Sequence, residues 1–147
     1  MTTLYLDTSS LLKIYVDEDG SDDVRQQLAE YSSAATSAVT YAEARSAFAR
    51  RRRDGTLTAA VFRAVKRAFD ADWPQYVVVE ATAAVGRAAG ELAERYALRG
   101  FDSLHLATFL HVARDRRPAD VGFSSCDHAL NRAAGNAMRS LYRKSRV

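Results

Sequence analysis

Four acidic residues stand at positions from which carboxylates can do chemistry together. Asp7 and Asp127 each follow a short predicted strand, and Glu43 and Asp102 each lie in the first turn of a predicted helix. Clustered carboxylates repel one another, and a hard divalent cation bound by oxygen atoms relieves that repulsion. Mg²⁺ held in this way orients a water molecule and neutralises charge on a phosphodiester. The four acids therefore favour metal-assisted phosphodiester hydrolysis, and they leave the substrate open.

Each acid also has a structural interpretation. Asp7 and Asp102 both stand where an aspartate commonly caps a helix, and a cap needs no further function. Glu43 is harder to explain, because no Lys or Arg stands three or four residues away on its own helix. Its partner must therefore come from elsewhere in the fold. His105, three residues after Asp102, is interpreted as a packed side chain rather than a catalytic one.

Strand-like and helix-like segments alternate along the chain, and this alternation predicts the fold class. The predicted strands are 4–6, 34–38, 76–79 and 120–125; helices are predicted to begin near residues 9, 21, 39, 57, 82, 102 and 128. The tail from 138 to 147 is predicted to form a last short strand or to fray. The pattern indicates an α/β fold with a central parallel sheet of four or five strands and helices on both faces. In such a sheet the carboxyl ends of the strands share one edge, where all four acids can converge.

Length and composition bound the class of protein. The 147 residues, 48% of them hydrophobic, predict a single globular domain over 1–147 with a substantial core. The one cysteine, Cys126, excludes an intramolecular disulfide and a Cys-rich zinc site, and it suits a reducing compartment. No basic leader precedes the first strand, and no apolar run has the length of a membrane span. We therefore expect a cytoplasmic protein without a signal peptide.

The distribution of charge favours a polyanionic partner. The net charge is +3, from 21 basic and 18 acidic residues. If four acids lie together in one site, 14 remain on the rest of the molecule, which is then distinctly cationic. Four consecutive arginines end the helix predicted from residue 39, and a helix cap does not need so many. Arg51, Arg52 and Arg53 are accordingly candidates for contact with RNA.

Several other classes of protein fit the sequence poorly. A phosphotransferase of the haloacid-dehalogenase type needs a second aspartate two residues after Asp7, where Ser9 stands. A receiver domain needs a Lys-Pro pair near its end, and neither proline follows a lysine. A dinucleotide-binding fold needs a glycine-rich turn after the first strand, and the residues from Asp7 to Ser10 include no glycine.

Four segments, taken in order and at their separations, resemble a known family. They are Leu6-Asp7-Thr8-Ser9, Thr40-Tyr41-Ala42-Glu43, Leu98-Arg99-Gly100-Phe101-Asp102-Ser103-Leu104-His105-Leu106-Ala107 and Phe123-Ser124-Ser125-Cys126-Asp127-His128-Ala129-Leu130. Together they resemble the PIN-domain nucleases, and among them the VapC-like toxins of type II toxin–antitoxin pairs. The resemblance extends over nearly the whole chain.

The resemblance implies a three-layer PIN-like fold and a Mg²⁺-dependent endoribonuclease, with Mn²⁺ as a possible substitute. It implies a homodimer held inactive by a cognate antitoxin protein. The metal-binding and catalytic acids of the family correspond to Asp7, Glu43, Asp102 and Asp127, with Ser9 and Ser125 as supporting polar residues. The chain departs from the family at its carboxyl end: family members often follow the last helix with glycine and an apolar strand, whereas here Gly135-Asn136-Ala137-Met138 leads into a basic tail.

Two alternatives remain open at this point. The first is a non-catalytic RNA-binding or scaffold protein of the same fold, although the presence of all four acids argues against it. The second is a DNA nuclease, because no residue visibly recognises a 2′-hydroxyl and the choice of RNA rests on the resemblance.

Overall fold

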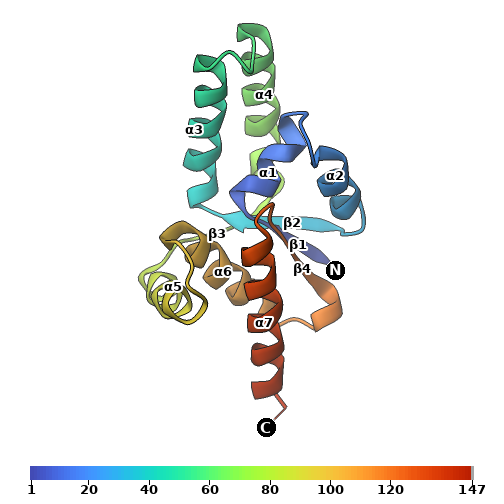
Figure 1. The fold of residues 1–147 in the computed structure, drawn as a ribbon. Coiled ribbons are helices and arrows are strands. Elements are labelled where there is room, and N and C mark those ends of the chain that lie inside the picture. Colours follow the sequence, from blue (N-terminus) through green and yellow to red (C-terminus); the bar gives the residue numbers. More distant parts are fainter. Residues whose placement is uncertain (147) are drawn as a thin grey trace.

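The computed structural model describes residues 1–146, which form a parallel sheet between two layers of helices (Figure 1). The strands are β1 (Thr3–Leu6), β2 (Ser33–Ser37), β3 (Val77–Val79) and β4 (Val121–Ser124). The α-helices are α1 (Thr8–Tyr15), α2 (Ser21–Ala29), α3 (Val39–Arg53), α4 (Ala59–Asp72), α5 (Ala83–Tyr96), α6 (Gly100–Ala113) and α7 (His128–Lys144). Short 3-10 helices, η1 (Trp73–Gln75) and η2 (Pro118–Asp120), precede β3 and β4. The predicted α/β class and parallel sheet are confirmed.

The sheet has the strand order β3-β2-β1-β4, so β1 lies between two parallel neighbours. Leu4 pairs in register with Ala34 of β2 on one side and with Gly122 of β4 on the other. Leu6 pairs with Ser124 at the carboxyl end of both strands. The end of β1 is therefore flanked by backbone on both sides, and whatever follows Leu6 lies in the middle of the carboxyl edge.

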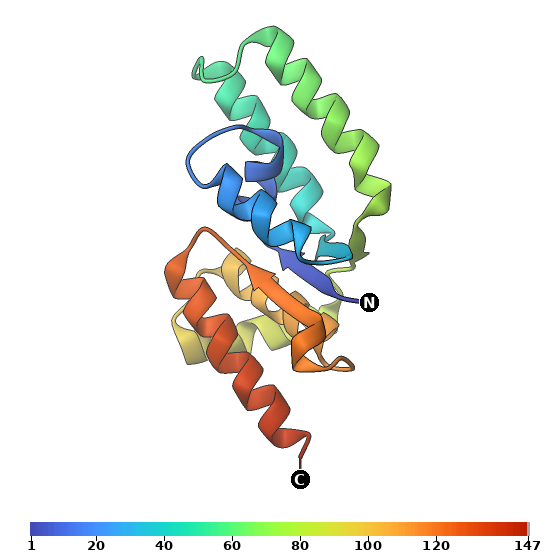
Figure 2. The same ribbon diagram turned by 90° about the vertical axis from the view of Figure 1, so that its right-hand side faces the viewer.

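Alternate residues of β1 face different cores, as the period of a strand requires. Leu4 and Leu6 pack into a cluster with α1–α4, which includes Leu11, Phe48 and Phe69. Tyr5 points the other way and packs against α6, α7 and the ring of Phe123. Figures 1 and 2 show the same division, with α1–α4 on one face of the sheet and α5–α7 on the other. This division is the three-layer arrangement that was predicted.

The carboxyl end of the chain differs from the prediction. Helix α7 runs without interruption to Lys144, and residues 1–146 contain no fifth strand. Leu130, Ala133, Ala134 and Ala137 recur at helical spacing and are all buried against the second core. Gly135 does not end the helix, because its backbone does not adopt the positive φ of a glycine that terminates a helix. The prediction for Val147 lies outside the described residues.

No helix among the residues described is both long enough and apolar enough to cross a membrane.

Gly122 provides a test of how closely β4 packs on its neighbours. A Cβ built there would lie 2.7 Å from Cζ of Tyr31, which precedes β2, and 3.2 Å from Cδ1 of Leu4 on β1, so both side chains would have to shift. We expect Gly122→Ala to lower the free energy of unfolding by about 1–3 kcal/mol, as overpacking does elsewhere. Urea denaturation measures the change.

The matched control is Gly90→Ala on α5, where no atom lies within 4 Å of the added Cβ. Alanine in a helix interior is favoured over glycine by up to about 1 kcal/mol, so this variant is expected to be as stable as the wild type or more stable. Equal stability of the two variants would contradict the close packing of β4.

Candidate functional site

Asp7 occupies the carboxyl end of the central strand and begins the first helix. Its backbone N–H donates to the carbonyl of Ser124 at 3.1 Å, which continues the pairing of β1 with β4 by one residue. Its carboxylate Oδ1 accepts from the Ser10 N–H at 3.0 Å and from the Ser9 hydroxyl at 2.7 Å, so it is also the N-cap of α1. The residue is only 4% exposed. Burial raises the pKa of Asp7, although hydrogen bonds from the serines and the nearby His105 act in the opposite direction.

Two serines connect Asp7 with Asp127. The Ser9 hydroxyl, which donates to Asp7, lies 3.5 Å from the Ser125 hydroxyl and accepts from the Cys126 N–H at 3.0 Å. Ser125 Oγ in turn accepts from the Asp127 N–H at 3.0 Å. Asp127 is the N-cap of α7, since its Oδ1 accepts from two backbone N–H groups of the first turn at 2.8 and 3.2 Å. The predicted supporting residues Ser9 and Ser125 therefore lie between these two acids.

Arg99 connects Asp127 with Asp102. Its Nε donates to Asp102 Oδ2 at 3.1 Å, and its Nη2 lies 3.9 Å from Asp127 Oδ2. The guanidinium is 83% exposed, whereas the Asp102 side chain is 21% exposed. A cation thus lies between the two carboxylates at the surface of the site. Arg99 was not identified from the sequence as a partner of Asp102, although it stands three residues before Asp102, at the spacing of an ion pair on one helical face.

Glu43 finds its partners on other elements, as expected. Its Oε1 accepts from the Thr8 hydroxyl at 2.7 Å and lies 3.1 Å from His105 Nε2. Burial raises the pKa of Glu43, but the hydrogen bonds from His105 and Thr8 and the charge on His105 outweigh it, so the net pKa is lowered. Since Thr8 directly follows Asp7, Glu43 belongs to the same edge of the sheet.

His105 is a packed side chain, as interpreted from the sequence, and it is also hydrogen-bonded at both ring nitrogens. Nδ1 lies 2.9 Å from the buried Tyr5 hydroxyl, and Nε2 faces Glu43. Nε2–H can donate to the Glu43 carboxylate while Nδ1 remains within hydrogen-bond distance of the Tyr5 hydroxyl. The ring therefore fixes the orientation of Glu43 from beneath, in the manner of an outer-shell partner. Its connection to Glu43 was missed, because residues so far apart in sequence carry no local signal.

The predicted arginines have different environments. Arg51 Nη2 pairs with Glu18 Oε1 at 2.9 Å, and the Arg51 side chain is only 23% exposed. Arg52 and Arg53 are exposed at the end of α3. Closer to the acids is Arg50, which lines an open depression of about 480 Å³ together with Thr8 and Glu43. The contact with RNA predicted for residues 51–53 stays a prediction, and Arg51 already has an acidic partner.

The donor set fits a hard divalent cation by its chemistry. The four acids offer carboxylate oxygens, and the serines between Asp7 and Asp127 offer hydroxyl oxygens, which are the atoms that such a cation prefers. The guanidinium of Arg99 already places one positive charge between Asp102 and Asp127. Within residues 1–146, however, no three side chains of His, Cys, Asp or Glu lie close enough together to hold a metal ion. The structure brings the four acids to one edge through Ser9, Ser125, Thr8 and Arg99, and it does not bring three of them within ligand distance of one point. Their role as metal ligands stays a prediction.

The sequence matches the family described as PIN domain over residues 4–123. The chain belongs to the PIN-domain family. Two curated relatives are ribonuclease VapC45 and ribonuclease VapC49 from strains of Mycobacterium tuberculosis. Each is 35% identical over 112 residues, which cover 76% of this chain and 78% of the relative.

Two solved structures share the fold of this PIN domain. FitAcB from Neisseria gonorrhoeae superimposes with a TM-score of 0.67 at 15% identity, covering 90% of this chain and 93% of that one. PAE2754 from Pyrobaculum aerophilum gives a TM-score of 0.62 at 16% identity, covering 97% and 90%. At these identities the likeness concerns the fold, and it agrees with the predicted three-layer PIN-like architecture.

The buried charge of Asp7 predicts a stability that depends on pH. The folded-state pKa is raised by burial, so the ionised carboxylate destabilises the fold as the pH rises through that pKa. Asparagine keeps the cap, because its amide oxygen accepts from the same Ser10 N–H. In the presence of a chelator, we expect Asp7→Asn to unfold a few degrees above the wild type at neutral pH. At about pH 3, below the unfolded-state pKa, the two melting temperatures should coincide.

A matched control with the opposite sign is Asp120→Asn. The hydrogen bond and charge of Arg117 lower the pKa of Asp120, so its ionised form stabilises the fold above the unfolded-state pKa. This variant is expected to melt below the wild type at neutral pH. A neutral-pH melting temperature of Asp7→Asn equal to or below that of the wild type would show that the Asp7 charge is fully compensated in the absence of metal.

Proposed function

We propose that this PIN domain, comprising residues 1–147, is a Mg²⁺-dependent endoribonuclease and the toxin of a toxin–antitoxin pair in the cytoplasm. The observation that carries the proposal is the set of four carboxylates at one sheet edge, where burial raises the pKa of the most buried of them, Asp7. A buried carboxylate of this kind is costly for a protein that only needs a helix cap. The choice of RNA is supported by the ribonuclease names of the two relatives at 35% identity.

The residues that would hold Mg²⁺ are Asp7, Glu43, Asp102 and Asp127. When bound, the ion lowers the pKa of a coordinated water and neutralises charge on the scissile phosphate. The remaining residues position these acids. Ser9 and Ser125 keep Asp7 and Asp127 beside one another.

Glu43 is positioned separately, through Thr8 and the buried pair of His105 and Tyr5. This arrangement keeps the carboxylate from rotating away from the edge. Arg99 supplies positive charge at the exposed side of the site, where it suits an RNA phosphate as well as the two acids that it now contacts.

A cognate antitoxin and a second copy of the chain complete the proposed assembly. Both relatives are VapC ribonucleases by name, and the pairing with an antitoxin follows from the resemblance that the motifs support. A homodimer is proposed on the same basis.

The proposal is tested by cleavage of matched RNA and DNA oligonucleotides with Mg²⁺, with Mn²⁺ or with a chelator. We expect cleavage of RNA that needs the metal and that falls by at least about 100-fold in Asp102→Asn, because one metal ligand loses its charge. Asp115→Asn, which removes an exposed charge from the turn that follows α6, is the control.

Binding of RNA without cleavage, equal in wild type and Asp102→Asn, would replace the proposal with the RNA-binding or scaffold alternative. Cleavage of DNA in preference to RNA would replace it with the DNA nuclease.

Arg99 and a metal ion compete for the same two carboxylates, which gives a second test. Arg99→Gln removes the guanidinium between Asp102 and Asp127. Because exposed ion pairs contribute about 0.2–1 kcal/mol, we expect Mn²⁺ to bind about 1.4- to fivefold more tightly to this variant. Isothermal titration with Mn²⁺ alone measures the affinity, with Arg87→Gln on the exposed face of α5 as the control. Weaker Mn²⁺ binding in Arg99→Gln than in the control would mean that Arg99 supports the metal site.

A further inference from the structure

The last helix carries only positive charge. Between His128 and Val147 the sequence contains five Arg or Lys residues and no Asp or Glu. All five are exposed: Arg132, Arg139, Arg143, Lys144 and Arg146. An ordinary surface helix alternates charges of both signs, which form pairs three or four residues apart. Helix α7 lacks any such pair, so its charge must serve something outside the chain or on another element.

Three of these arginines form a stripe along one side of α7, and Arg146, two residues after the helix ends, continues their spacing. Arg132, Arg139, Arg143 and Arg146 are separated by seven, four and three residues, which are the spacings of a single helical face. We name these four residues the arginine stripe. The ion pairs found within residues 1–146 include none of the stripe, whereas arginines elsewhere, such as Arg25, Arg51 and Arg117, pair with carboxylates. The stripe is therefore an unneutralised row of charge.

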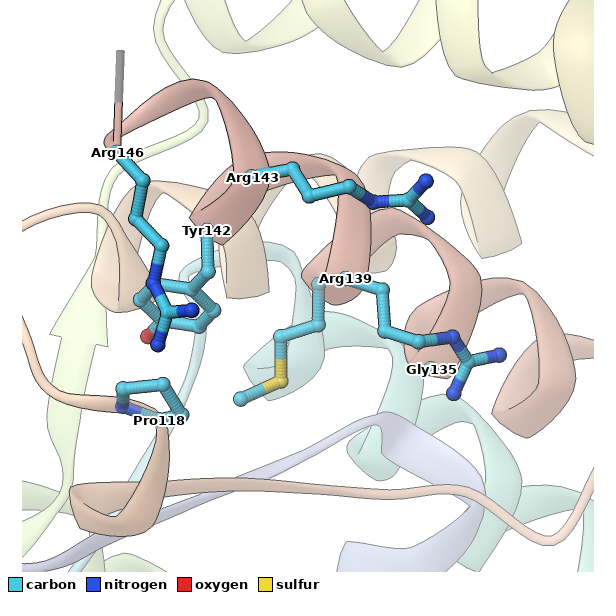
Figure 3. Close-up of a pocket in the computed structure, with 7 residues that line it drawn as sticks. Pro118, Gly135, Arg139, Tyr142, Arg143 and Arg146 are labelled. Carbon is cyan, nitrogen blue, oxygen red and sulfur yellow. The ribbon is translucent and has the colours of Figure 1, made fainter.

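The stripe borders two depressions that follow one another along α7. The first, of about 550 Å³, is lined by His128, Arg132 and Asn136 and extends to Arg139. The second, of about 580 Å³, has Arg139, Arg143 and Arg146 around Met138, Tyr142 and Pro118 (Figure 3). The Tyr142 hydroxyl donates to the carbonyls of Ala113 and Arg116, which fixes its ring at the base of this groove. Figure 3 shows Arg139 and Arg143 extending from the helix in the same direction.

The stripe is continuous with the acidic edge. Helix α7 begins immediately after Asp127 and runs for 17 residues, about 25 Å at the rise of an α-helix, toward the opposite end of the sheet. Figures 1 and 2 both show it extending away from the helical pair α3 and α4. A chain molecule bound at the acidic edge can therefore continue along the stripe without crossing an acidic surface of α7.

We propose that the arginine stripe binds the sugar–phosphate backbone of a single-stranded RNA segment next to the scissile phosphate. This inference deepens the proposed function and rests on it for the identity of the ligand. Phosphates repeated along a strand match guanidiniums repeated along a helix, and Arg pairs with phosphate in a bidentate manner. The apolar base of the second groove accommodates a nucleobase, and only an unpaired strand offers its bases while its phosphates are held.

The experiment measures binding of an oligouridine of about 16 nucleotides over a series of salt concentrations, in a chelator so that no cleavage occurs. In Arg139→Gln/Arg143→Gln, two phosphate contacts are lost. We expect the slope of log K against log salt to decrease by about 1.4 and the affinity at low salt to fall about tenfold. The matched control is Arg63→Gln/Arg67→Gln on α4, which removes two exposed arginines at the same spacing and is expected to bind like the wild type.

A conservative pair separates charge from fold. Arg139→Lys/Arg143→Lys keeps both positive charges and is expected to restore the slope to that of the wild type, and urea denaturation shows that each variant is folded. An unchanged slope in Arg139→Gln/Arg143→Gln would overturn the inference. So would a polyglutamate peptide that binds the wild type and not this variant while RNA binds both alike, because the stripe would then belong to an acidic protein partner.

The inference and the proposed function fail separately. If the wild type binds the oligouridine through the stripe and never cleaves RNA with any metal, the stripe is confirmed and the nuclease is not. If RNA is cleaved in a metal-dependent way while the stripe variants bind with the salt slope of the wild type, the nuclease stands and the stripe is overturned.

Discussion

The buried carboxylate of Asp7 is the constraint on which the site depends. It is placed by the pairing of β1 with β2 and β4, because a strand with neighbours on both sides ends in the middle of the sheet edge. There the carboxylate loses water, and the Ser10 N–H, the Ser9 and Ser125 hydroxyls and the nearby His105 compensate for part of that loss. The raised pKa of Asp7 shows that this compensation is incomplete. A cation that approaches Asp7 therefore stabilises its ionised carboxylate.

The other three acids are each held by a different kind of partner. Asp127 is held by backbone N–H groups and Ser125, Asp102 by a guanidinium, and Glu43 by an imidazole and a hydroxyl. No acid is positioned by a contact with another acid. The carboxylates that repel one another are therefore distributed along the whole edge. The partners also differ in exposure: His105 is buried beneath the sheet edge, whereas Arg99 faces solvent. The buried His105 fixes the position of Glu43, whereas the exposed Arg99 can move away from Asp102 and Asp127.

The sequence predicted those features that depend on local periodicity. The strand and cap at Asp7, the bounds of α3 and the parallel sheet all follow from spacings of a few residues, and so did the need of Glu43 for a distant partner. That this partner is His105 could not be predicted, because the contact depends on the packing of α6 against β1, and the spacing of residues in the sequence does not indicate that packing. The length of α7 was missed for a different reason. The basic tail was predicted to form a short strand or to fray, and the alanines buried along the helix are too small to give a strong apolar signal.

Acidic and basic side chains occupy different parts of this molecule, and their arrangement gives the proposed RNA site a direction. Four carboxylates meet at the carboxyl edge, and the arginine stripe leads away from it on α7. On the other side Arg50 borders the depression over Glu43, while Arg51 is already neutralised by Glu18. A polyanion repelled by the bare acids is therefore attracted from both flanks, and a divalent cation at the edge removes the repulsion between them. Binding along the flanks and charge neutralisation at the centre are separate requirements, because the residues that meet them lie on different elements.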